Sequence, residues 1–444
     1  MSVYDEYRSK LRTADEAVRL VKNGDWVDYA SNNGFPKTLD AALAKRRDEL
    51  WGVKIRGNLI SGPIQVAECD TGFEHFVYNS WFCSAYERRL IDAHRAFFIP
   101  MDFRNMGAYY ENYLTVNVAM LAVTPMNDKG YFSRSTCQGI PKAIIDKADI
   151  VILEVNEALP WMCGGEESYV HISEADVVVE AGSYPLLEMK APRPSETEVR
   201  IAQNLLPFIK NGATMQLGIG GVPNALGELI ADSDLKNLGM HTELAADGYL
   251  AMYRAGKLTN RCKTLHPGKS VAAIAMGTRD FYDWIDHNDE FLGLPLSYVN
   301  DPHVLAKNNS MISINGCLNV DLYGQVNAES VGFRQISGTG GQLDFVAGAV
   351  HSAGGKAFLC LPSTHTGKDG TVQSRIVPHF NMDIITTPRS MCHYIVTEYG
   401  AVNLAGLTTW ERAEALISVA HPDFRDGLIK NAQEQHIWLP SNKR

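Results

Sequence analysis

Short apolar runs rich in β-branched residues alternate with helix-length amphipathic segments along the whole chain. Such runs include VKIRGNLI (53–60), DIVILEV (149–155), DVVVEAG (176–182), ATMQLGIG (213–220) and KAFLCLPS (356–363). Strands that alternate with helices predict an α/β fold built on largely parallel, open sheets. A single hydrophobic core rarely grows beyond roughly 250–300 residues. The 444 residues therefore predict two domains.

A proline-rich segment, EMKAPRPSETEVR (188–200), is the best candidate for the link between the domains. Pro192 and Pro194 disfavour regular structure, and Ser195 with Glu198 forms the pattern of a capping box that opens a helix. We expect this helix to run over ETEVRIAQNLLPFIKNG and to end at Gly212. The predicted domains are residues 1–190 and 191–444.

The two halves contain weak copies of one pattern. The segments 25–46 and 213–232 both read as strand, Gly-x-Pro turn and helix, so that Gly34 and Pro36 match Gly221 and Pro223. Later, LAVTPMNDKGYFSRS (121–135) resembles CLNVDLYGQVNAES (317–330), again in the same order. These matches predict that the two α/β domains arose by internal duplication.

The composition excludes several classes of protein. A formal net charge of −10 without a Lys/Arg cluster argues against nucleic-acid binding. The charged N-terminal stretch lacks the apolar region of a signal peptide, and no run has the 18 or more apolar residues of a membrane span. The eight cysteines are scattered without a C-x-x-C pair, which argues against disulfides and structural zinc. We therefore expect reduced thiols, a cytoplasmic location and no metal.

The stretch QLGIGGVPNAL (216–226) places Gly218, Gly220 and Gly221 between a predicted strand and a predicted helix. Glycine permits a close approach of the backbone to a ligand, and the start of a helix favours negative charge. The third glycine of a dinucleotide fingerprint would fall on Pro223, so NAD binding is not indicated. In the first half, Asn33 takes the place of Gly220. A tight strand–helix turn without a ligand remains the alternative.

A single carboxylate, Glu243, lies in the mostly apolar run GMHTELAADG (239–248). On a strand, Gly239, His241 and Glu243 would share one face. Ligands of open parallel sheets lie at strand ends, where an ionised carboxylate can act as a nucleophile. A helix cap or a buried ion pair is the alternative interpretation of Glu243, and a structural histidine that of His241. The matching position in the first half, in VKIRGNLISG (53–62), has no acid.

Five motifs occur in the order typical of the acetyl-CoA hydrolase/transferase family of class I CoA-transferases. They are GIGGVPNAL, GMHTELAADG, DLYGQVNAES, SGTGGQLDFVAGA and VTEYGAVNLAG. The chain resembles this family over nearly its whole length, and most of all the butyryl-CoA:acetate and 4-hydroxybutyrate CoA-transferases. The resemblance implies two tandem CoA-transferase-type (NagB/RpiA-like) domains, with the catalytic glutamate in the C-terminal one.

The resemblance also implies the site residues. The nucleophile falls on Glu243, which becomes a glutamyl-CoA thioester. The CoA-contacting residues fall on Gly218, Ile219, Gly220, Gly221, Val222, Gly341 and Lys368. A flexible loop is the alternative for the SGTGGQ segment around Gly341, and a solvated surface lysine is the alternative for Lys368.

The implied reaction moves CoA from a short-chain acyl-CoA to a free carboxylic acid such as acetate, without ATP, metal or a permanently bound cofactor. The implied partners are acyl-CoA and small carboxylic acids, and a second copy of the chain in a homodimer. Two departures, at Ala405 and in YENYLTVNVAM (110–120), leave the acids open, including dicarboxylates such as succinate or itaconate. A thioester hydrolase on the same scaffold and a non-catalytic metabolite-binding protein are the rival functions. No chemistry is assigned to Glu398.

Overall fold

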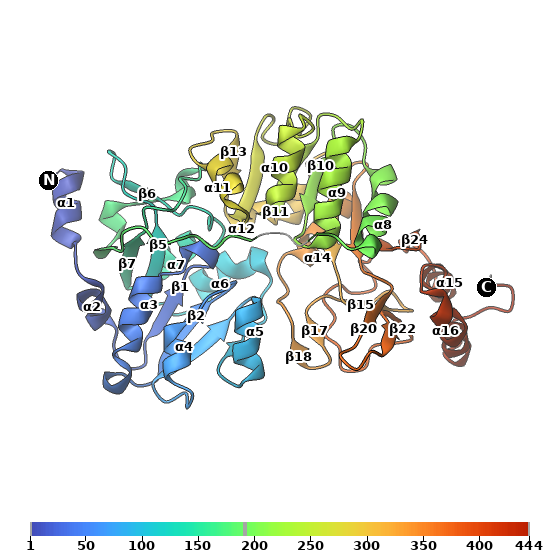
Figure 1. Ribbon diagram of the computed structural model, residues 1–444, viewed down its shortest axis with the longest axis horizontal. Coiled ribbons are helices and arrows are strands. Elements are labelled where there is room, and N and C mark those ends of the chain that lie inside the picture. The colour runs from blue at the N-terminus through green and yellow to red at the C-terminus, as the bar shows by residue number, and fades with distance from the viewer. Residues whose placement is uncertain (1, 190–192, 443–444) are drawn as a thin grey trace. The chain divides into compact units, whose positions relative to one another are not determined.

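The computed structural model describes residues 2–189 and 193–442, and the chain divides into two compact units (Figure 1). Unit 1 comprises residues 1–189, 271–299 and 335–340, and unit 2 comprises residues 190–270, 300–334 and 341–444. The predicted boundary at residue 190 and the linker residue Pro192 lie outside the described residues. The predicted limits of the two domains, as independently folding parts, stay a prediction.

The core of unit 1 is a parallel sheet with the strand order β4-β3-β2-β1-β5-β7-β9. Its strands are β1 (Trp26–Tyr29), β2 (Val53–Gly57), β3 (Phe76–Ser80), β4 (Phe97–Phe98), β5 (Val118–Val123), β7 (Ile150–Val155) and β9 (Val177–Glu180). All six residues of β5 are buried, as expected for a strand that helices cover on both faces.

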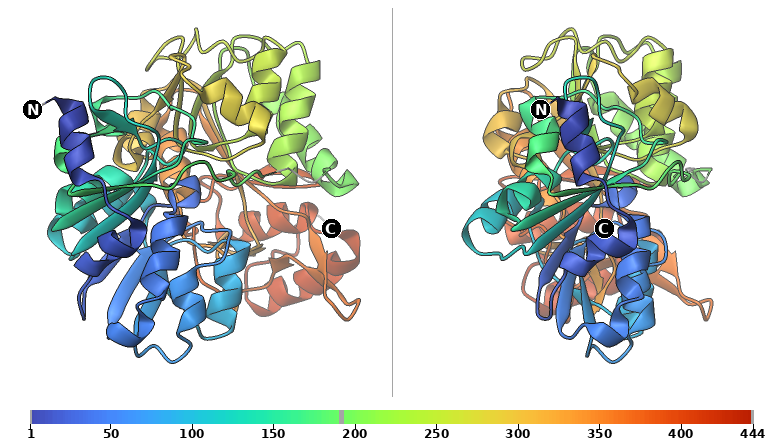
Figure 2. Two further views of the ribbon diagram at one scale, coloured as in Figure 1. Left: turned by 60° about the vertical axis from the view of Figure 1, so that its left-hand side comes forward. Right: turned by 90° about the vertical axis from the view of Figure 1, so that its left-hand side faces the viewer.

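Helices flank this sheet on two sides. Those that lie along one face are α3 (Lys37–Ala44), α4 (Gln65–Cys69) and α5 (Ala85–Asp92), and those on the other are α6 (Met106–Asn112) and α7 (Pro141–Lys147) (Figures 1 and 2). The N-terminal helices are α1 (Val3–Lys10) and α2 (Ala14–Ala17), and β6 (Tyr131–Ser133) pairs with β8 (Tyr169–His171). The later segment of unit 1 contains β12 (Ser270–Ala275), α11 (Arg279–Ile285), β13 (Phe291–Gly293) and α12 (Leu296–Val299).

Bridges hold this later segment within unit 1. Cys137 pairs with Ile274, and Gly164 pairs with Gly293. Gly139 lies so close to Leu296 that a Cβ at Gly139 would come within 2.6 Å of the leucine Cγ. The sequence does not predict that residues 271–299 belong to unit 1, because this depends on contacts between residues more than 100 positions apart.

The core of unit 2 is a second open sheet, in which the strands of this unit follow the order β11-β10-β14-β19-β23-β24. They are β10 (Thr214–Leu217), β11 (Gly239–Ala245), β14 (Met311–Gly316), β19 (Lys356–Cys360), β23 (Tyr394–Thr397) and β24 (Gly400–Asn403). Only β24 pairs antiparallel to its neighbour. The predicted α/β class with largely parallel open sheets is therefore confirmed.

Three helices of unit 2 lie next to one another. Figure 1 shows α8 (Glu196–Leu205), α9 (Gly221–Asp232) and α10 (Asp247–Arg254) side by side. The remaining helices are α13 (Pro302–Ala306), α14 (Gln342–His351), α15 (Thr409–Ser418) and α16 (Pro422–Glu434). The minor strands are β15 (Asn319–Asp321), β16 (Val326–Asn327), β17 (Ser330–Val331), β18 (Arg334–Gln335), β20 (Thr364–Thr366), β21 (Val372–Ser374) and β22 (Ile376–Val377).

The helix predicted over residues 196–212 is shorter than expected. Its start is correct: Ser195 and Glu198 form the capping box. Its predicted end at Gly212 is wrong, because α8 ends at Leu205 and a single 3₁₀ turn, Leu206–Phe208, follows. Pro207 lacks the N–H that would continue an α-helix.

The two sheets share a topology. In unit 1, the first strand, β1, lies between β2 and β5. In unit 2, the first strand, β10, lies in the same way between β11 and β14. In each sheet, one neighbour is the next strand in the sequence and the other comes later, after several intervening elements. Both first strands lead through a turn into a helix, α3 or α9. The duplication itself, with superposition of the two halves as copies, stays a prediction.

Candidate active site

The glycine-rich turn connects β10 to α9, as predicted. Gly220 is the N-cap of α9 and has φ +128°, a conformation that residues with a Cβ rarely adopt. Gly218 is half-buried, whereas Ile219 and Gly220 are exposed, so this turn presents backbone to solvent. Val222 is half-buried in the first turn of the helix.

Gly221 is a glycine for reasons of space. A Cβ at this position would lie 2.1 Å from Oε1 of Glu198, the residue that closes the capping box of α8. The close packing of α8 against α9 therefore requires a small residue here. This packing role is separate from the CoA contact predicted for Gly221, which stays a prediction.

Glu243 lies on β11, next to β10 in the sheet. The printed register pairs Thr214 with Gly239 and Met215 with Met240. Extended by three positions, this register aligns Glu243 with Gly218, the first residue after β10. The Oγ1 atom of Thr242 lies 3.4 Å from the carbonyl oxygen of Leu217, which holds the ends of the two strands together.

Two residues from distant parts of the sequence meet the Glu243 carboxylate. Asn300, which is fully buried, donates a hydrogen bond from Nδ2 to Glu243 Oε2 at 2.7 Å. Gly341, the N-cap of α14, lies against both: a Cβ here would be 2.2 Å from Glu243 Oε2 and 2.1 Å from Asn300 Nδ2. Because the φ of Gly341 is −111°, glycine is required here by space and not by backbone conformation.

The packing of α13 against α14 sets this arrangement. Gly348 of α14 contacts Leu305 of α13, and a Cβ at Gly348 would lie 2.3 Å from the leucine Cβ. Asn300 precedes α13 and Gly341 precedes α14, so the close contact of these two helices brings their starts together. Asn300 was missed in the sequence, where SYVNDPHV (297–304) indicates only a turn before a helix.

The other candidate residues lie elsewhere in unit 2. Lys368 is exposed in the turn that joins β20 to β21. His241 is buried on β11, and its Nδ1 lies 3.4 Å from Asn308 Nδ2. Glu398 accepts hydrogen bonds from the backbone N–H of Ser363 at 2.9 Å and from its hydroxyl at 2.5 Å, so it fixes the chain after β19.

The matching turn of unit 1 differs at the start of its helix. There Glu154, fully buried on β7, accepts hydrogen bonds from the backbone N–H groups of Thr38 and Leu39 at 3.2 and 2.8 Å. The chain itself thus supplies a carboxylate to the N-terminus of α3. Burial raises the pKa of Glu154, and these hydrogen bonds oppose that rise.

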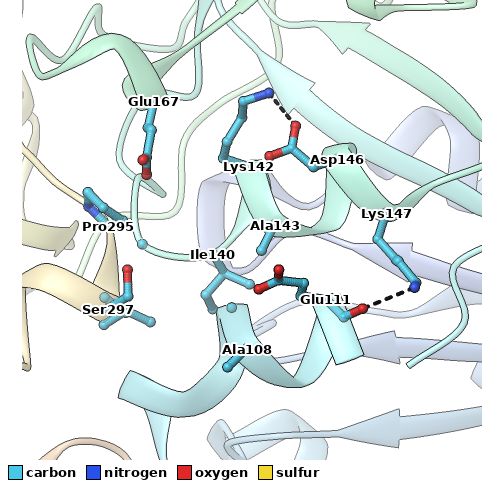
Figure 3. A pocket seen from close by; sticks show the side chains of 13 residues that line it. Ala108, Glu111, Ile140, Lys142, Ala143, Asp146, Lys147, Glu167, Pro295 and Ser297 are labelled. Atoms are coloured by element: carbon cyan, nitrogen blue, oxygen red, sulfur yellow. Dashed lines mark hydrogen bonds and ion pairs between the residues drawn. The ribbon is translucent and has the colours of Figure 1, made fainter. Parts of the chain in front are cut away.

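Two of the pockets in the described structure are lined by residues of unit 1. A pocket of about 470 Å³ lies beside this turn, between residues such as Asn33, Lys37 and Gln65. A pocket of about 660 Å³ is bordered by α6 and α7, where Lys142 pairs with Asp146 and Lys147 donates to the carbonyl oxygen of Glu111 (Figure 3). None of the predicted site residues lines either pocket.

Among the described residues, no group of three or more His, Cys, Asp or Glu side chains could hold a metal ion. In the same part of the chain, no helix combines the length and apolar character that a membrane crossing needs.

Comparison with known proteins places this chain in a family. Residues 1–187 match the model of the acetyl-CoA hydrolase/transferase N-terminal domain, and residues 277–432 match that of the C-terminal domain. The chain belongs to the acetyl-CoA hydrolase/transferase family, as its motifs predicted.

Two relatives and one solved structure are similar to this chain over nearly their whole lengths. The butyryl-CoA:acetate CoA-transferase of Anaerostipes caccae is 45% identical, with 100% of each chain covered. The 4-hydroxybutyrate coenzyme A transferase of Clostridium kluyveri is 40% identical, with 97% of this chain and 98% of the relative covered. The crystal structure of RipA from Yersinia pestis matches with a TM-score of 0.90 at 34% identity, covering 98% of this chain and 100% of RipA.

Proposed function

We propose that the protein transfers CoA from a short-chain acyl-CoA to a free carboxylic acid such as acetate, through a covalent intermediate on Glu243. The observation that carries this proposal is the placement of the Glu243 carboxylate, on the strand beside the glycine turn, against Asn300 and Gly341. The names of its close relatives, butyryl-CoA:acetate and 4-hydroxybutyrate CoA-transferases, support the same reaction.

The first half-reaction forms the intermediate. A Glu243 oxygen attacks the thioester carbonyl of the acyl-CoA, and the C–S bond breaks to give a mixed anhydride and CoA thiolate. The thiolate then attacks the glutamyl carbonyl, forms the glutamyl-CoA thioester and releases the first acid as a carboxylate. The second acid reverses these steps. One thioester is formed for each one lost, so the exchange needs no ATP.

The residues around Glu243 are suited to these steps. A side-chain amide that donates to a carboxylate orients it and can also donate to an oxyanion formed at the same carbon. Asn300 is placed for this role through its bond to Oε2. Because Gly341 carries no side chain, the face of the carboxylate beside α14 stays free of a methyl group that would displace it.

The predicted CoA contacts belong to this proposal. Gly218, Ile219, Gly220, Gly221 and Val222 would contact CoA through the backbone of an exposed turn, and Lys368 would meet its phosphate groups as an exposed cation. The Michaelis constant for acyl-CoA tests these contacts. Lys368→Met should raise this constant and leave kcat unchanged. The control Lys210→Met, at another exposed position of unit 2, should change neither quantity.

The oligomeric state and the cellular location of the protein are also proposals. We expect a homodimer, which light scattering after gel filtration tests. A cytoplasmic location stays our expectation, in line with the scattered cysteines of the sequence. Hydrolysis on the same scaffold would differ in one respect: CoA release would proceed without an added carboxylate.

The decisive experiment traps the intermediate. The protein is treated with butyryl-CoA without an acceptor acid and then with borohydride, which reduces a thioester to an alcohol. Mass spectrometry should find the alcohol at Glu243, and addition of acetate before the borohydride should remove it. If Glu243 stays unmodified after incubation with a molar excess of acyl-CoA, the covalent route is refuted.

A further inference from the structure

A completely buried polar loop follows β6 in unit 1. The six residues Ser133–Gln138 each expose 2% of their surface or less. Several of their polar groups are satisfied within the unit: Ser133 Oγ donates to the carbonyl oxygen of Met162 at 3.2 Å, and Gln138 Nε2 donates to that of Ser135 at 2.9 Å. The loop is thus fixed by hydrogen bonds within itself and to Met162.

The guanidinium group of Arg134 is the exception. None of its three nitrogen atoms has a hydrogen-bond partner among the described residues, although the side chain is 2% exposed. The other buried arginine of this unit, Arg56, behaves in the ordinary way and donates to both carboxylate oxygens of Asp28, at 2.9 and 2.7 Å. Unit 1 therefore contains one buried guanidinium with a carboxylate and one without.

No carboxylate of the described chain is hydrogen-bonded to Arg134, and Glu167, Asp146 and Glu174 act on it only through space. Glu174 already pairs with Lys142, at 2.6 Å, and the side chain of Glu167 is exposed. The thiol of Cys137 lies 2.8 Å from Ser31 Oγ, and burial raises its pKa, so it stays neutral at pH 7. Burial lowers the pKa of Arg134 only to about 10, so the guanidinium remains charged.

An unpaired buried charge is costly. The effective penalty for removing one ion from water is several kcal/mol even after the protein relaxes. Buried polar groups in folded proteins are nearly always hydrogen-bonded, yet two further groups of this loop, Ser135 Oγ and Thr136 Oγ1, also have no partner in the described structure. A guanidinium and hydroxyl groups are donors typical of an anion site, and here three such buried side chains follow one another in the sequence.

We propose that the loop Ser133–Gln138 is a binding site for a small monovalent anion, held by the Arg134 guanidinium with the Ser135 and Thr136 hydroxyl groups. The enclosure of the loop restricts the occupant to a small ion, either a halide or a short carboxylate such as formate or acetate. The anion completes the core of unit 1 by neutralising a charge that the chain leaves unpaired. The residues of this site belong to unit 1, whereas Glu243 belongs to unit 2.

The test begins with the stability of the full-length protein. After dialysis into sodium gluconate, whose anion is too large for the site, thermal unfolding is followed while bromide, chloride, formate or acetate replaces gluconate at constant ionic strength. The wild type should show a saturable rise in Tm of at least about 2 °C, because a ligand that binds only the folded state stabilises it. The series distinguishes halide from carboxylate.

Matched variants assign the effect. Arg134→Met should abolish the dependence on small anions, Arg134→Lys should retain it at higher concentrations, and Arg19→Met, at an exposed position of unit 1, should behave as the wild type. An equal rise in Arg134→Met and wild type, or no rise in the wild type with any of the four anions, would overturn the proposal.

A direct measurement needs no variant. Crystals of the wild-type protein soaked in sodium bromide should give an anomalous peak beside the Arg134 guanidinium if halides bind. If only the carboxylates raise Tm, a crystal grown in acetate should show the carboxylate there instead. A loop filled by water alone under both conditions would refute the site.

Discussion

Asn300 Nδ2 donates a hydrogen bond to Glu243 Oε2 at 2.7 Å, across 57 positions of sequence. If Glu243 is the nucleophile, Asn300 acts on the reaction through it. Asn300→Ala should lower kcat roughly 10- to 100-fold, because a hydrogen bond to a charged group contributes about 1.5–3 kcal/mol. Rapid-quench measurement of glutamyl-CoA formation checks this, and an unchanged rate of that step would exclude the role.

Asn300→Asp gives a separate signature in the pH profile. Two adjacent carboxyl groups cannot both ionise easily, so the pKa of the pair should rise relative to that of Glu243 in the wild type. Since attack needs the carboxylate, kcat should fall at low pH and recover as the pH rises through the raised pKa. A profile parallel to that of the wild type would contradict this expectation.

Replacement of Glu243 tests the nucleophile itself. Glu243→Gln keeps the shape and removes the ionised oxygen, so exchange between acyl-CoA and free acid should fall to background while the fold is retained. Glu243→Asp withdraws the carboxylate by on the order of 1 Å, a misplacement that can cost about 100-fold. Isotope exchange between labelled acetate and acyl-CoA measures both, with circular dichroism as the control for folding.

Gly341→Ala should inactivate the enzyme without unfolding it. The added methyl group would lie 2.1–2.2 Å from the polar atoms of Asn300 and Glu243, which would have to separate. We expect kcat to fall at least about 100-fold, the scale of a small misplacement at a reacting group. Gly427→Ala, in α16 with nothing within 4 Å of the new methyl group, is the matched control and should keep full activity.

Gly220→Val tests the glycine turn. The structure puts no atom within 4 Å of a Cβ here, so the cost comes from the backbone at φ +128° and not from crowding inside the protein. Strain of this kind amounts to about 1–3 kcal/mol. If the turn contacts the thioester, activity should fall at least about 100-fold, the scale of one lost oxyanion donor. A variant that is less stable but fully active would limit this glycine to a structural role.

The lowered pKa of Lys263 predicts that the free energy of unfolding depends on pH. Lys263 is buried, its Nζ donates to the carbonyl oxygens of Met240 and Lys269 at 2.7 Å each, and burial lowers its pKa to about 7. Between pH ~7 and the unfolded value near 10.4, the unfolded chain binds the extra proton, so this group makes the free energy of unfolding rise with pH.

Lys263→Met should remove that contribution. The difference in unfolding free energy between wild type and variant should change with a slope of at most about 1.4 kcal/mol per pH unit in this range, the value for one proton. Urea titrations at pH 7, 8 and 9 measure it. A difference that stays constant across these three values would show that Lys263 is not deprotonated in the folded protein.

The sequence determined the local features of this protein, because they depend on neighbouring residues. The apolar runs become β2, β7, β9, β10 and β19, and the Ser195–Glu198 pair caps α8 where expected. The position of Glu243 on a strand after the glycine turn also follows from local pattern. The motifs identified the family, since their order along the chain is itself a property of the sequence.

Only the tertiary structure decided which distant residues meet. Asn300 and Gly341 contact Glu243 because α13 packs against α14, and no periodicity in the sequence encodes that contact. The return of residues 271–299 to unit 1 and the burial of Arg134 without a carboxylate arise in the same way. Side-chain packing between elements far apart in the chain sets these features, whereas hydrogen bonds and apolar patterns within each element set the rest.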